Sequence, residues 1–182
     1  MKVILASNSP RRKQLLSEIG VDFTVIPSNF IEPKNFGLSP EKYVEFLAKS
    51  KAESVFKTHG GVVIGADTVV VYEDKILGKP KNEIDAISML TSLSNKTHRV
   101  ITGYAIISEN KIISNYEVTY VTFNNLSKRF IEDYVKSGSP LDKAGAYGIQ
   151  DDDRIVKNII GDYDNVVGLP TKKIIDALTE FI

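Results

Sequence analysis

Three observations in the sequence predict an α/β protein with a mixed, twisted sheet and flanking helices. Short apolar runs of strand length alternate with segments of helical periodicity in the first half of the chain. Two helical segments open with a Ser-Pro pair, at Ser9 and Ser39, in which serine can cap the helix and proline can take its first position. The β-rich segment 97–123 has a tight-turn signal at Glu109–Asn110 and favours an antiparallel hairpin. Helices that alternate with strands beside an inserted hairpin predict a mixed sheet.

The elements follow from local signals along the chain. No repeat, linker or low-complexity segment divides it, so residues 1–182 are predicted to form a single domain. The expected elements are a strand at 2–6, a helix at 10–19, a strand at 21–27, a loop at 28–38, a helix from 40 to about 59, two β blocks within 62–72 split by Gly65–Thr68, a hairpin tip at Asp74–Lys75, a helix at 83–93, the hairpin at 97–123, a helix at about 127–136, a glycine-rich loop at 139–150 and a last helix at about 170–178.

Composition excludes several functional classes. Lys+Arg and Asp+Glu each number 23, so the formal net charge is zero, and binding to nucleic acid or a membrane through bulk charge is not expected. The absence of cysteine excludes thiol catalysis and disulfides, and two histidines exclude a His-rich zinc site. The apolar N-terminal stretch is too short for a signal peptide, and no stretch approaches membrane-spanning length. A cytoplasmic protein is therefore expected.

Two arginines directly follow the first Ser-Pro pair, where the partial positive charge of a helix N-terminus disfavours cations. Arg12 precedes Leu15 and Leu16 of the inward stripe by three and four residues, so it is expected to face the fold or a cleft at its edge. Together with Arg11, the Ser7 hydroxyl and free backbone N–H groups, it would make a receptor for phosphate. Solvated arginines beside an ordinary helix cap are the alternative.

Two further charges interrupt apolar patterns. Lys51 lies between Leu47 and Val55 on one helix stripe, where a snorkelling lysine is the alternative to an inward cation. Asp67 lies between two valine-rich blocks, although aspartate is disfavoured in strands and a buried carboxylate is costly unless paired or metal-bound. Asp67 is predicted to hold Mg²⁺ or to take a proton from water. A bulge or turn, with its carboxylate bonded to backbone, is the alternative.

Weaker signals come from two loops. Lys79 stands in a Gly-Lys-Pro turn, and residues 139–150 offer Gln150 among small residues that would let a planar ligand approach the backbone. His98 is expected to serve the structure. Several cations with one or two carboxylates suit metal-assisted phosphate chemistry, without deciding between a hydrolase, a kinase and a binder.

Six stretches together carry a family resemblance. The chain resembles the Maf (septum formation inhibitor) family of nucleoside triphosphate pyrophosphatases, whose motifs occur here in the family's order over nearly the whole chain. The matching stretches are SNSPRR (7–12), GADTVV (from 65), GKP (78–80), THRVITG (97–103), DKAGAYGIQ (142–150) and NVVGLP (165–170).

The resemblance implies a fold related to inosine-triphosphate pyrophosphatases, with two lobes around a cleft. It implies hydrolysis between the α- and β-phosphates with a divalent cation, Mg²⁺ or Mn²⁺. By the same match Asp67 is the catalytic residue, and Glu32 and Asp67 hold the metal. The implied substrate-binding residues are Ser7, Arg11, Arg12, Lys51, Thr68, Lys79 and Gln150.

The family resemblance also implies a preference among nucleotide bases. Arg11 directly after the Ser-Pro pair, together with AGAYGIQ, is similar to the branch that hydrolyses dTTP and UTP. Arg11, Thr68 and Gln150 would then govern base choice, and an amide such as that of Gln150 can pair with a pyrimidine edge. One departure stands at Asp151–Asp153, where three carboxylates would repel a triphosphate unless they point away or bind metal.

The resemblance leaves two functional classes open. The expected partner is a nucleoside triphosphate substrate, without nucleic acid or membrane, and a homodimer is left open as the oligomeric state. The alternative is a nucleotide-binding regulator of septum formation that has no turnover. The carboxylates favour an enzyme, because a pure anion binder gains nothing from them.

Overall fold

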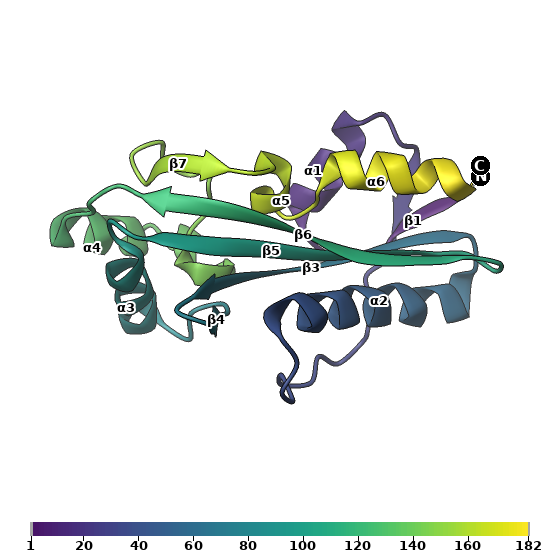
Figure 1. Ribbon diagram of the computed structural model, residues 1–182, viewed down its shortest axis with the longest axis horizontal. Coiled ribbons are helices and arrows are strands. Elements are labelled where there is room, and N and C mark those ends of the chain that lie inside the picture. Colours follow the sequence, from purple (N-terminus) through teal and green to yellow (C-terminus); the bar gives the residue numbers. More distant parts are fainter. Residues whose placement is uncertain (1, 182) are drawn as a thin grey trace. The chain divides into compact units, whose positions relative to one another are not determined.

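The computed structural model describes residues 2–181 and confirms the predicted mixed α/β fold (Figure 1). The 3₁₀ helices are η1 (Ser139–Asp142), η2 (Ala144–Ala146) and η3 (Thr179–Phe181). The strands are β1 (Val3–Leu5), β2 (Phe23–Val25), β3 (Val62–Tyr72), β4 (Lys75–Leu77), β5 (Thr97–Ile107), β6 (Ile112–Phe123) and β7 (Val156–Ile160). The α-helices are α1 (Pro10–Glu18), α2 (Pro40–His59), α3 (Glu83–Leu93), α4 (Lys128–Lys136), α5 (Tyr163–Val167) and α6 (Thr171–Leu178).

The strands form one mixed sheet in the order β2-β1-β3-β5-β6-β7, with β4 paired to β3. β1 runs parallel to β2 and to β3, with Leu5 opposite Val25 on one side and Ile64 on the other. β4 pairs antiparallel with β3, and β7 pairs antiparallel with β6. The chain therefore combines the parallel crossovers and the hairpins that its pattern predicts.

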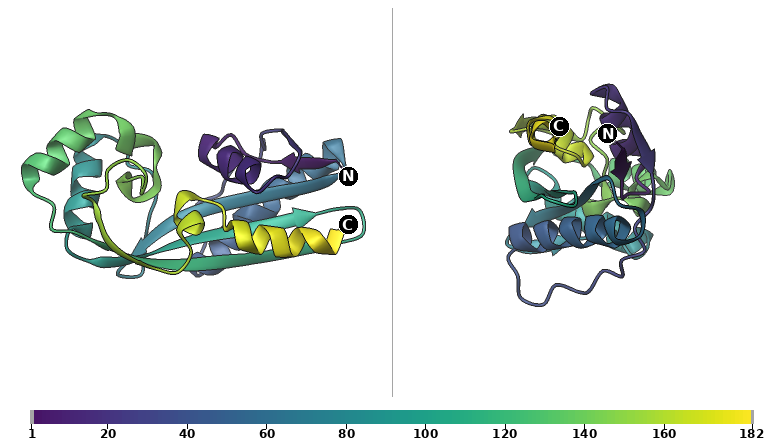
Figure 2. Two further views of the ribbon diagram at one scale, coloured as in Figure 1. Left: turned by 90° about the horizontal axis from the view of Figure 1, so that it is seen from above. Right: turned by 90° about the vertical axis from the view of Figure 1, so that its right-hand side faces the viewer.

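Two compact units share these elements. Unit 1 comprises Met1–Thr68, Thr102–Glu117 and Asp164–Ile182, and unit 2 comprises Val69–Ile101 and Val118–Tyr163. β3, β5 and β6 contribute residues to both. Within unit 1, α2 covers one face of the strands, and α1 and α6 lie on the other face (Figures 1 and 2).

The Ser-Pro pairs start α1 and α2 as predicted. The Ser9 hydroxyl accepts a hydrogen bond from the backbone N–H of Arg12, and the Ser39 hydroxyl accepts one from Lys42. Each proline takes the first turn, where a missing N–H leaves no hydrogen bond unmade. These caps fix where each helix begins and so which of its faces meets the sheet.

Glycines on two strands let α2 approach the sheet closely. A Cβ added at Gly65 of β3 would lie 2.3 Å from the Ala48 carbonyl oxygen, and one at Gly103 of β5 would lie 2.3 Å from Val44. Any larger residue would push the helix outward, because a real carbon does not approach backbone oxygen so closely. α2 packs here through small residues, with Ala48 and Ala52 fully buried. The close packing holds Lys51 of α2 near Asp67 of β3.

Two hairpins confirm their predicted positions to within a residue. The β5–β6 turn lies at Glu109–Asn110, as predicted, and a hydrogen bond from Ser108 N–H to the Lys111 carbonyl closes it. The β3–β4 tip was predicted at Asp74–Lys75, but Tyr72 pairs with Lys75, so the tip is Glu73–Asp74. Both tip residues have positive φ, 47° and 59°, as a two-residue hairpin turn of type I′ requires.

Residues 62–72 were expected as two β blocks split by Gly65–Thr68, and this is wrong. β3 continues without a break through Asp67. The alternative of a bulge or turn at Asp67 is therefore also wrong. The preference of the flanking valines for extended backbone, and the place of β3 between β1 and β5 in the sheet, outweigh the poor strand propensity of Gly65 and Asp67.

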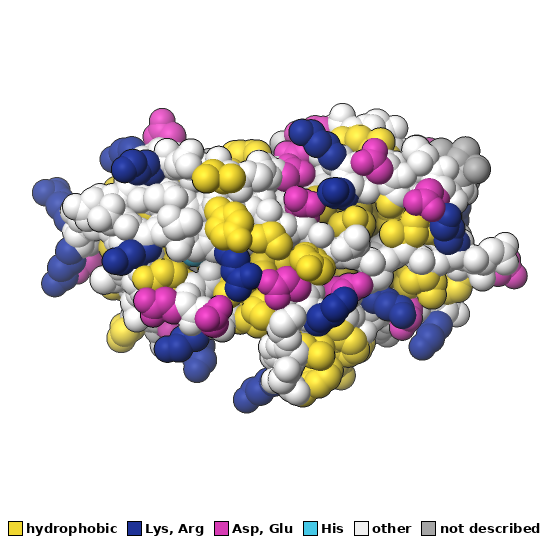
Figure 3. Space-filling model, in the orientation of Figure 1, with side chains coloured by type: hydrophobic (Ala, Val, Ile, Leu, Met, Phe, Trp, Pro, Cys, Tyr) yellow, Lys and Arg dark blue, Asp and Glu magenta, His cyan; other side chains and the backbone are white. Residues whose placement is uncertain are grey.

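The surface carries charges of both signs. Lys and Arg side chains lie among Asp and Glu side chains on the face that Figure 3 draws, which agrees with the zero formal net charge. Within residues 2–181, none of the helices combines the length and the apolar character that a membrane crossing needs.

Candidate active site

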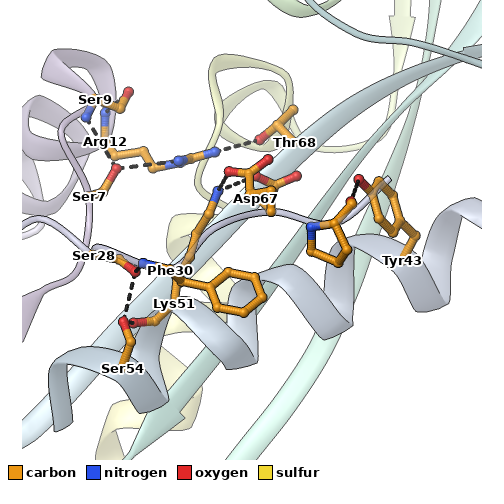
Figure 4. Close-up of polar contacts among 12 residues, drawn as sticks. Ser7, Ser9, Arg12, Ser28, Phe30, Tyr43, Lys51, Ser54, Asp67 and Thr68 are labelled. Atoms are coloured by element: carbon orange, nitrogen blue, oxygen red, sulfur yellow. Dashed lines mark hydrogen bonds and ion pairs between the residues drawn. The ribbon is translucent and has the colours of Figure 1, made fainter. Parts of the chain in front are cut away.

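Six of the predicted site residues come together in unit 1, around the adjacent residues Asp67 and Thr68 of β3 (Figure 4). One set of contacts joins Asp67 to Lys51 and Glu32, and a second joins Thr68 to Arg12 and Ser7. They come from β3, from α1 and the turn before it, from α2, and from the loop between β2 and α2. The site therefore draws on four separate segments of the sequence.

Lys51 holds two carboxylates at once. Its Nζ lies 2.5 Å from Asp67 Oδ1 and 2.6 Å from Glu32 Oε1. The Lys51 and Asp67 side chains are 14% and 13% exposed, so solvent screens their interaction little, whereas Glu32 is 48% exposed. The snorkelling alternative for Lys51 is wrong, because its ammonium group is enclosed between two acids. Two carboxylate oxygens beside one nitrogen lie no more than about 5 Å apart.

Burial raises the pKa of Asp67 above its usual range, and the charges of Lys51 and Arg12 oppose that shift. A raised pKa makes the carboxylate a better proton acceptor once it is ionised. The two cations keep the ionised form accessible in a site that would otherwise disfavour it. Asp67 thus has the environment of a general base.

Arg12 points inward, as its spacing from Leu15 and Leu16 predicts. Its Nε donates to the Gly168 carbonyl at 2.8 Å, Nη2 donates to Thr68 Oγ1 at 3.1 Å, and Nη1 donates to Ser7 Oγ at 3.3 Å. Burial lowers its pKa from the usual value, and the charge of Asp67 opposes that change. These contacts fix the plane of the guanidinium, and a guanidinium has five N–H donors, so others stay available to a ligand.

The hydroxyl groups beside Arg12 have defined directions. Thr102 Oγ1 donates its proton to the Asn165 carbonyl at 2.9 Å, so in its 2.9 Å contact with Thr68 it must accept. Thr68 accordingly accepts from Arg12 and donates to Thr102, which leaves its oxygen only a lone pair for a ligand. These hydrogen bonds run from Ser7 through Arg12, Thr68 and Thr102 to Asn165. They join four of the six motif stretches that carry the family resemblance.

Ser7 can offer a ligand a hydrogen-bond donor, whereas Thr68 can offer only an acceptor. Its Oγ accepts from Ser9 N–H at 3.2 Å and from Arg12 Nη1, which occupies both lone pairs. Its own proton is then left to donate. Ser7 can therefore give a hydrogen bond to an anion at the start of α1.

The remaining predicted residues lie elsewhere or have less defined contacts. Arg11 is half-buried in the first turn of α1, where its charge contributes to lowering the pKa of Arg12. Lys79 and Gln150 belong to unit 2 and are exposed. Within unit 2 their two loops are joined, because Gly145 N–H donates to the Gly78 carbonyl at 3.1 Å.

The three aspartates that depart from the family pattern have partners of their own in unit 2. Asp151 accepts hydrogen bonds from Tyr134 Oη at 2.6 Å and Ser139 Oγ at 2.7 Å. Hydrogen bonds from Arg154 lower the pKa of Asp152 to about 2. Lys143 Nζ lies 3.7 Å from Asp151 and Arg154 Nη2 lies 2.6 Å from Asp152, so two of the three negative charges have a cation beside them.

Several residues of the site carry no sequence signal strong enough to single them out. Thr102 contacts Thr68, the Gly168 carbonyl contacts Arg12, and Tyr43 of α2 contacts the carbonyl of Pro33, the residue after Glu32. Thr102 and Gly168 do lie within the quoted motifs, which is the signal that could have found them. Tyr43 lies in none of the quoted motifs.

The donor set fits a divalent cation. Mg²⁺ prefers oxygen ligands and is commonly held by one or two carboxylates, with waters and substrate phosphates completing its shell. Glu32 and Asp67 supply such a pair of carboxylates, because both contact the Nζ atom of Lys51. Residues 2–181 contain no group of three or more His, Asp or Glu side chains that could hold a metal, so waters or substrate phosphates would complete the shell beside Glu32 and Asp67.

Fold and site together define an α/β protein in which a lysine-bridged carboxylate pair adjoins an inward-facing arginine at a helix N-terminus. The chain belongs to the family of Maf-like proteins, whose family model matches residues 2–181. It is 50% identical over 182 residues to a dTTP/UTP pyrophosphatase of Bacillus cereus (strain AH820), a match that covers 99% of this chain and 95% of that relative. A dTTP/UTP pyrophosphatase of Bacillus mycoides (strain KBAB4) is also 50% identical, with the same coverage.

The fold has a solved counterpart at low sequence identity. A HAM1 protein from Coxiella burnetii matches with a TM-score of 0.53 and 14% identity, covering 99% of each chain. This likeness confirms the fold class predicted from the sequence.

Proposed function

We propose that the protein hydrolyses nucleoside triphosphates between the α- and β-phosphates, with dTTP and UTP as substrates, to give a nucleoside monophosphate and pyrophosphate. The observation that carries the proposal is the carboxylate of Asp67, only 13% exposed, which shares Lys51 with Glu32 beside the guanidinium of Arg12. The names of relatives at 50% identity support the same reaction and substrates.

The triphosphate would be held by cations and hydrogen-bond donors. Arg11, Arg12 and Lys79 would neutralise phosphate oxygens, together with the Nζ proton of Lys51 that is left after its two carboxylate contacts. Ser7 supports this role because its hydroxyl proton has no other acceptor among its contacts. A triphosphate brings enough negative charge to outweigh the unfavourable position of two arginines at a helix N-terminus.

Asp67 would act as the general base. Its raised pKa supports proton abstraction from the water that attacks the α-phosphorus, with pyrophosphate as the leaving group. Glu32 and Asp67 would hold Mg²⁺ or Mn²⁺, which supplies charge neutralisation on the phosphates. Lys51 would keep both carboxylates oriented.

Base choice would depend on groups of defined polarity. Thr68 has only an acceptor lone pair to offer, which suits a ligand N–H, and the Gln150 amide can both donate and accept. Thymine and uracil present one ring N–H between two carbonyl oxygens, and an acceptor oxygen and an amide are each suited to part of this pattern. Arg11 would complete the selection.

One product panel tests the proposal against its rival. The protein is incubated with each common ribo- and deoxyribonucleoside triphosphate and Mg²⁺, and the products are separated by anion-exchange chromatography. The proposal expects monophosphate and pyrophosphate, fastest from dTTP and UTP. Diphosphate with phosphate would indicate another nucleotidase, and tight binding without any product would favour a nucleotide-binding regulator.

A further inference from the structure

The loop that carries Glu32 has no regular secondary structure, yet hydrogen bonds attach it to α2 before and after Glu32. Figure 4 shows the helix side chains Tyr43, Lys51 and Ser54 that face this loop. Tyr43, Lys51 and Ser54 all lie on α2 at spacings of eight and three residues, which places them on one helix face. Lys51 contacts Glu32 itself. The other two side chains contact the loop before and after it.

The attachment before Glu32 is a directed chain of hydrogen bonds. Ser54 Oγ donates to the Lys51 carbonyl at 2.9 Å, so in its 2.8 Å contact with Ser28 it must accept. Ser28 Oγ in turn accepts from the backbone N–H of Phe30 at 3.1 Å. The backbone two residues before Glu32 is thereby tied to the carbonyl group of Lys51, the residue that binds the Glu32 carboxylate.

The attachment after Glu32 is a single hydrogen bond. Tyr43 Oη donates to the Pro33 carbonyl at 3.0 Å, which fixes the residue that directly follows Glu32. Edge-on packing of Phe30 and Phe36 against Phe46 of α2 adds apolar support, with ring centroids 6.2 and 5.6 Å apart. Between these points the neighbouring Ile31 is 89% exposed, so local burial does not hold the segment.

We propose that Tyr43 and Ser54 are positioning residues that hold Glu32 for divalent-metal binding, which rests on the metal role given to Glu32 above. An exposed loop carboxylate on its own would lose conformational freedom on binding a metal, and that cost lowers affinity. Two attachments from the helix that also carries Lys51 remove this freedom beforehand. Partners that orient a metal ligand commonly change metal affinity by one or two orders of magnitude.

The test measures Mn²⁺ binding directly, by the loss of the free-Mn²⁺ electron paramagnetic resonance signal in nucleotide-free protein. Tyr43→Phe and Ser54→Ala should each raise the Mn²⁺ dissociation constant about 10-fold. Both substitutions should also speed amide hydrogen exchange of the segment 28–33, because each removes one of the two attachments of the loop to α2. The melting temperature without metal reports whether either variant has lost its fold.

Matched controls are present in the chain. Ser92 Oγ of α3 donates to the carbonyl three residues earlier, Met89, just as Ser54 does to Lys51, so Ser92→Ala removes the same local bond without a link to the loop. Tyr116→Phe controls for the loss of a tyrosine hydroxyl. Neither control should change Mn²⁺ affinity.

Glu32→Gln separates the two proposals. If Glu32→Gln binds Mn²⁺ as tightly as the unmodified protein, the metal role of Glu32 is wrong and the positioning role falls with it. If Glu32→Gln weakens Mn²⁺ binding but Tyr43→Phe and Ser54→Ala leave it unchanged, only the positioning role is overturned. Equal weakening in the Ser92 and Tyr116 controls also overturns it.

Discussion

Replacing His98 should remove a defined part of the protein's sensitivity to acid. His98 of β5 is 2% exposed, and its Nε2 lies 2.7 Å from Tyr147 Oη. Its ring packs edge-on against Phe123 and Tyr147. Nδ1 has no hydrogen-bond partner within the described residues, so an added proton there would find no acceptor. Burial accordingly lowers the pKa of His98 from 6.5 to about 4.

The magnitude follows from the two pKa values. Above pH 6.5 the histidine is neutral in both the folded and unfolded states, and it leaves the free energy of unfolding unchanged. Between pH 6.5 and 4 the unfolded chain binds a proton that the folded protein does not. Stability therefore falls by about 1.4 kcal/mol per pH unit across this window. At pH 4.5 the loss due to His98 should be about 2.5 kcal/mol.

Urea unfolding between pH 7.5 and 4.5 measures this loss. His98→Gln keeps a hydrogen-bonding group for Tyr147 without a titrating ring, so its stability should fall by about 2.5 kcal/mol less over this range than that of the unmodified protein. His59→Gln, at the exposed end of α2, is the control and should retain the full pH dependence. If His98→Gln and the unmodified protein lose stability equally, the argument from burial is refuted.

Two further substitutions test the packing and the hydrogen bonds of unit 1. Gly65→Ala would place Cβ 2.3 Å from the Ala48 carbonyl oxygen, so it should lower the free energy of unfolding by about 3 kcal/mol and reduce turnover, as measured by urea unfolding and pyrophosphate release. Gly78→Ala, where no atom lies within 4 Å, should change stability by less than about 0.5 kcal/mol, and an equal effect of both substitutions would contradict the packing argument. Arg12→Lys should cost about 2 kcal/mol in the same unfolding assay, because lysine cannot reproduce three hydrogen bonds from one rigid plane, and unchanged stability would show that those bonds contribute nothing.

The fold was predictable where local chemistry decides the structure. Ser9 and Ser39 cap their helices through their own side chains, so the starts of α1 and α2 follow from two adjacent residues. β7 was missed, because its residues alternate irregularly between half-buried and exposed and follow an acidic run. Pairing with β6 makes it a strand, and that pairing depends on residues more than 30 positions away in the chain.

The candidate site was predictable where a residue conflicts with its surroundings. Asp67 among valines and Lys51 within an apolar stripe are costly unless they meet, and the structure pairs them. Thr102 and Tyr43 gave no such conflict, because a hydroxyl on a strand or a helix is compatible with many environments. Their roles arise from neighbours that only the folded chain supplies.

The catalytic role of Asp67 is tested most directly by pyrophosphate release from dTTP with the Asp67→Asn variant. Asparagine keeps the shape of the side chain but cannot take a proton from water, so turnover should fall about 1,000-fold while the urea unfolding transition persists. Asp74→Asn makes the same change at an exposed hairpin tip and should leave turnover unaltered. A rate for Asp67→Asn close to that of the Asp74→Asn control would contradict the role of Asp67.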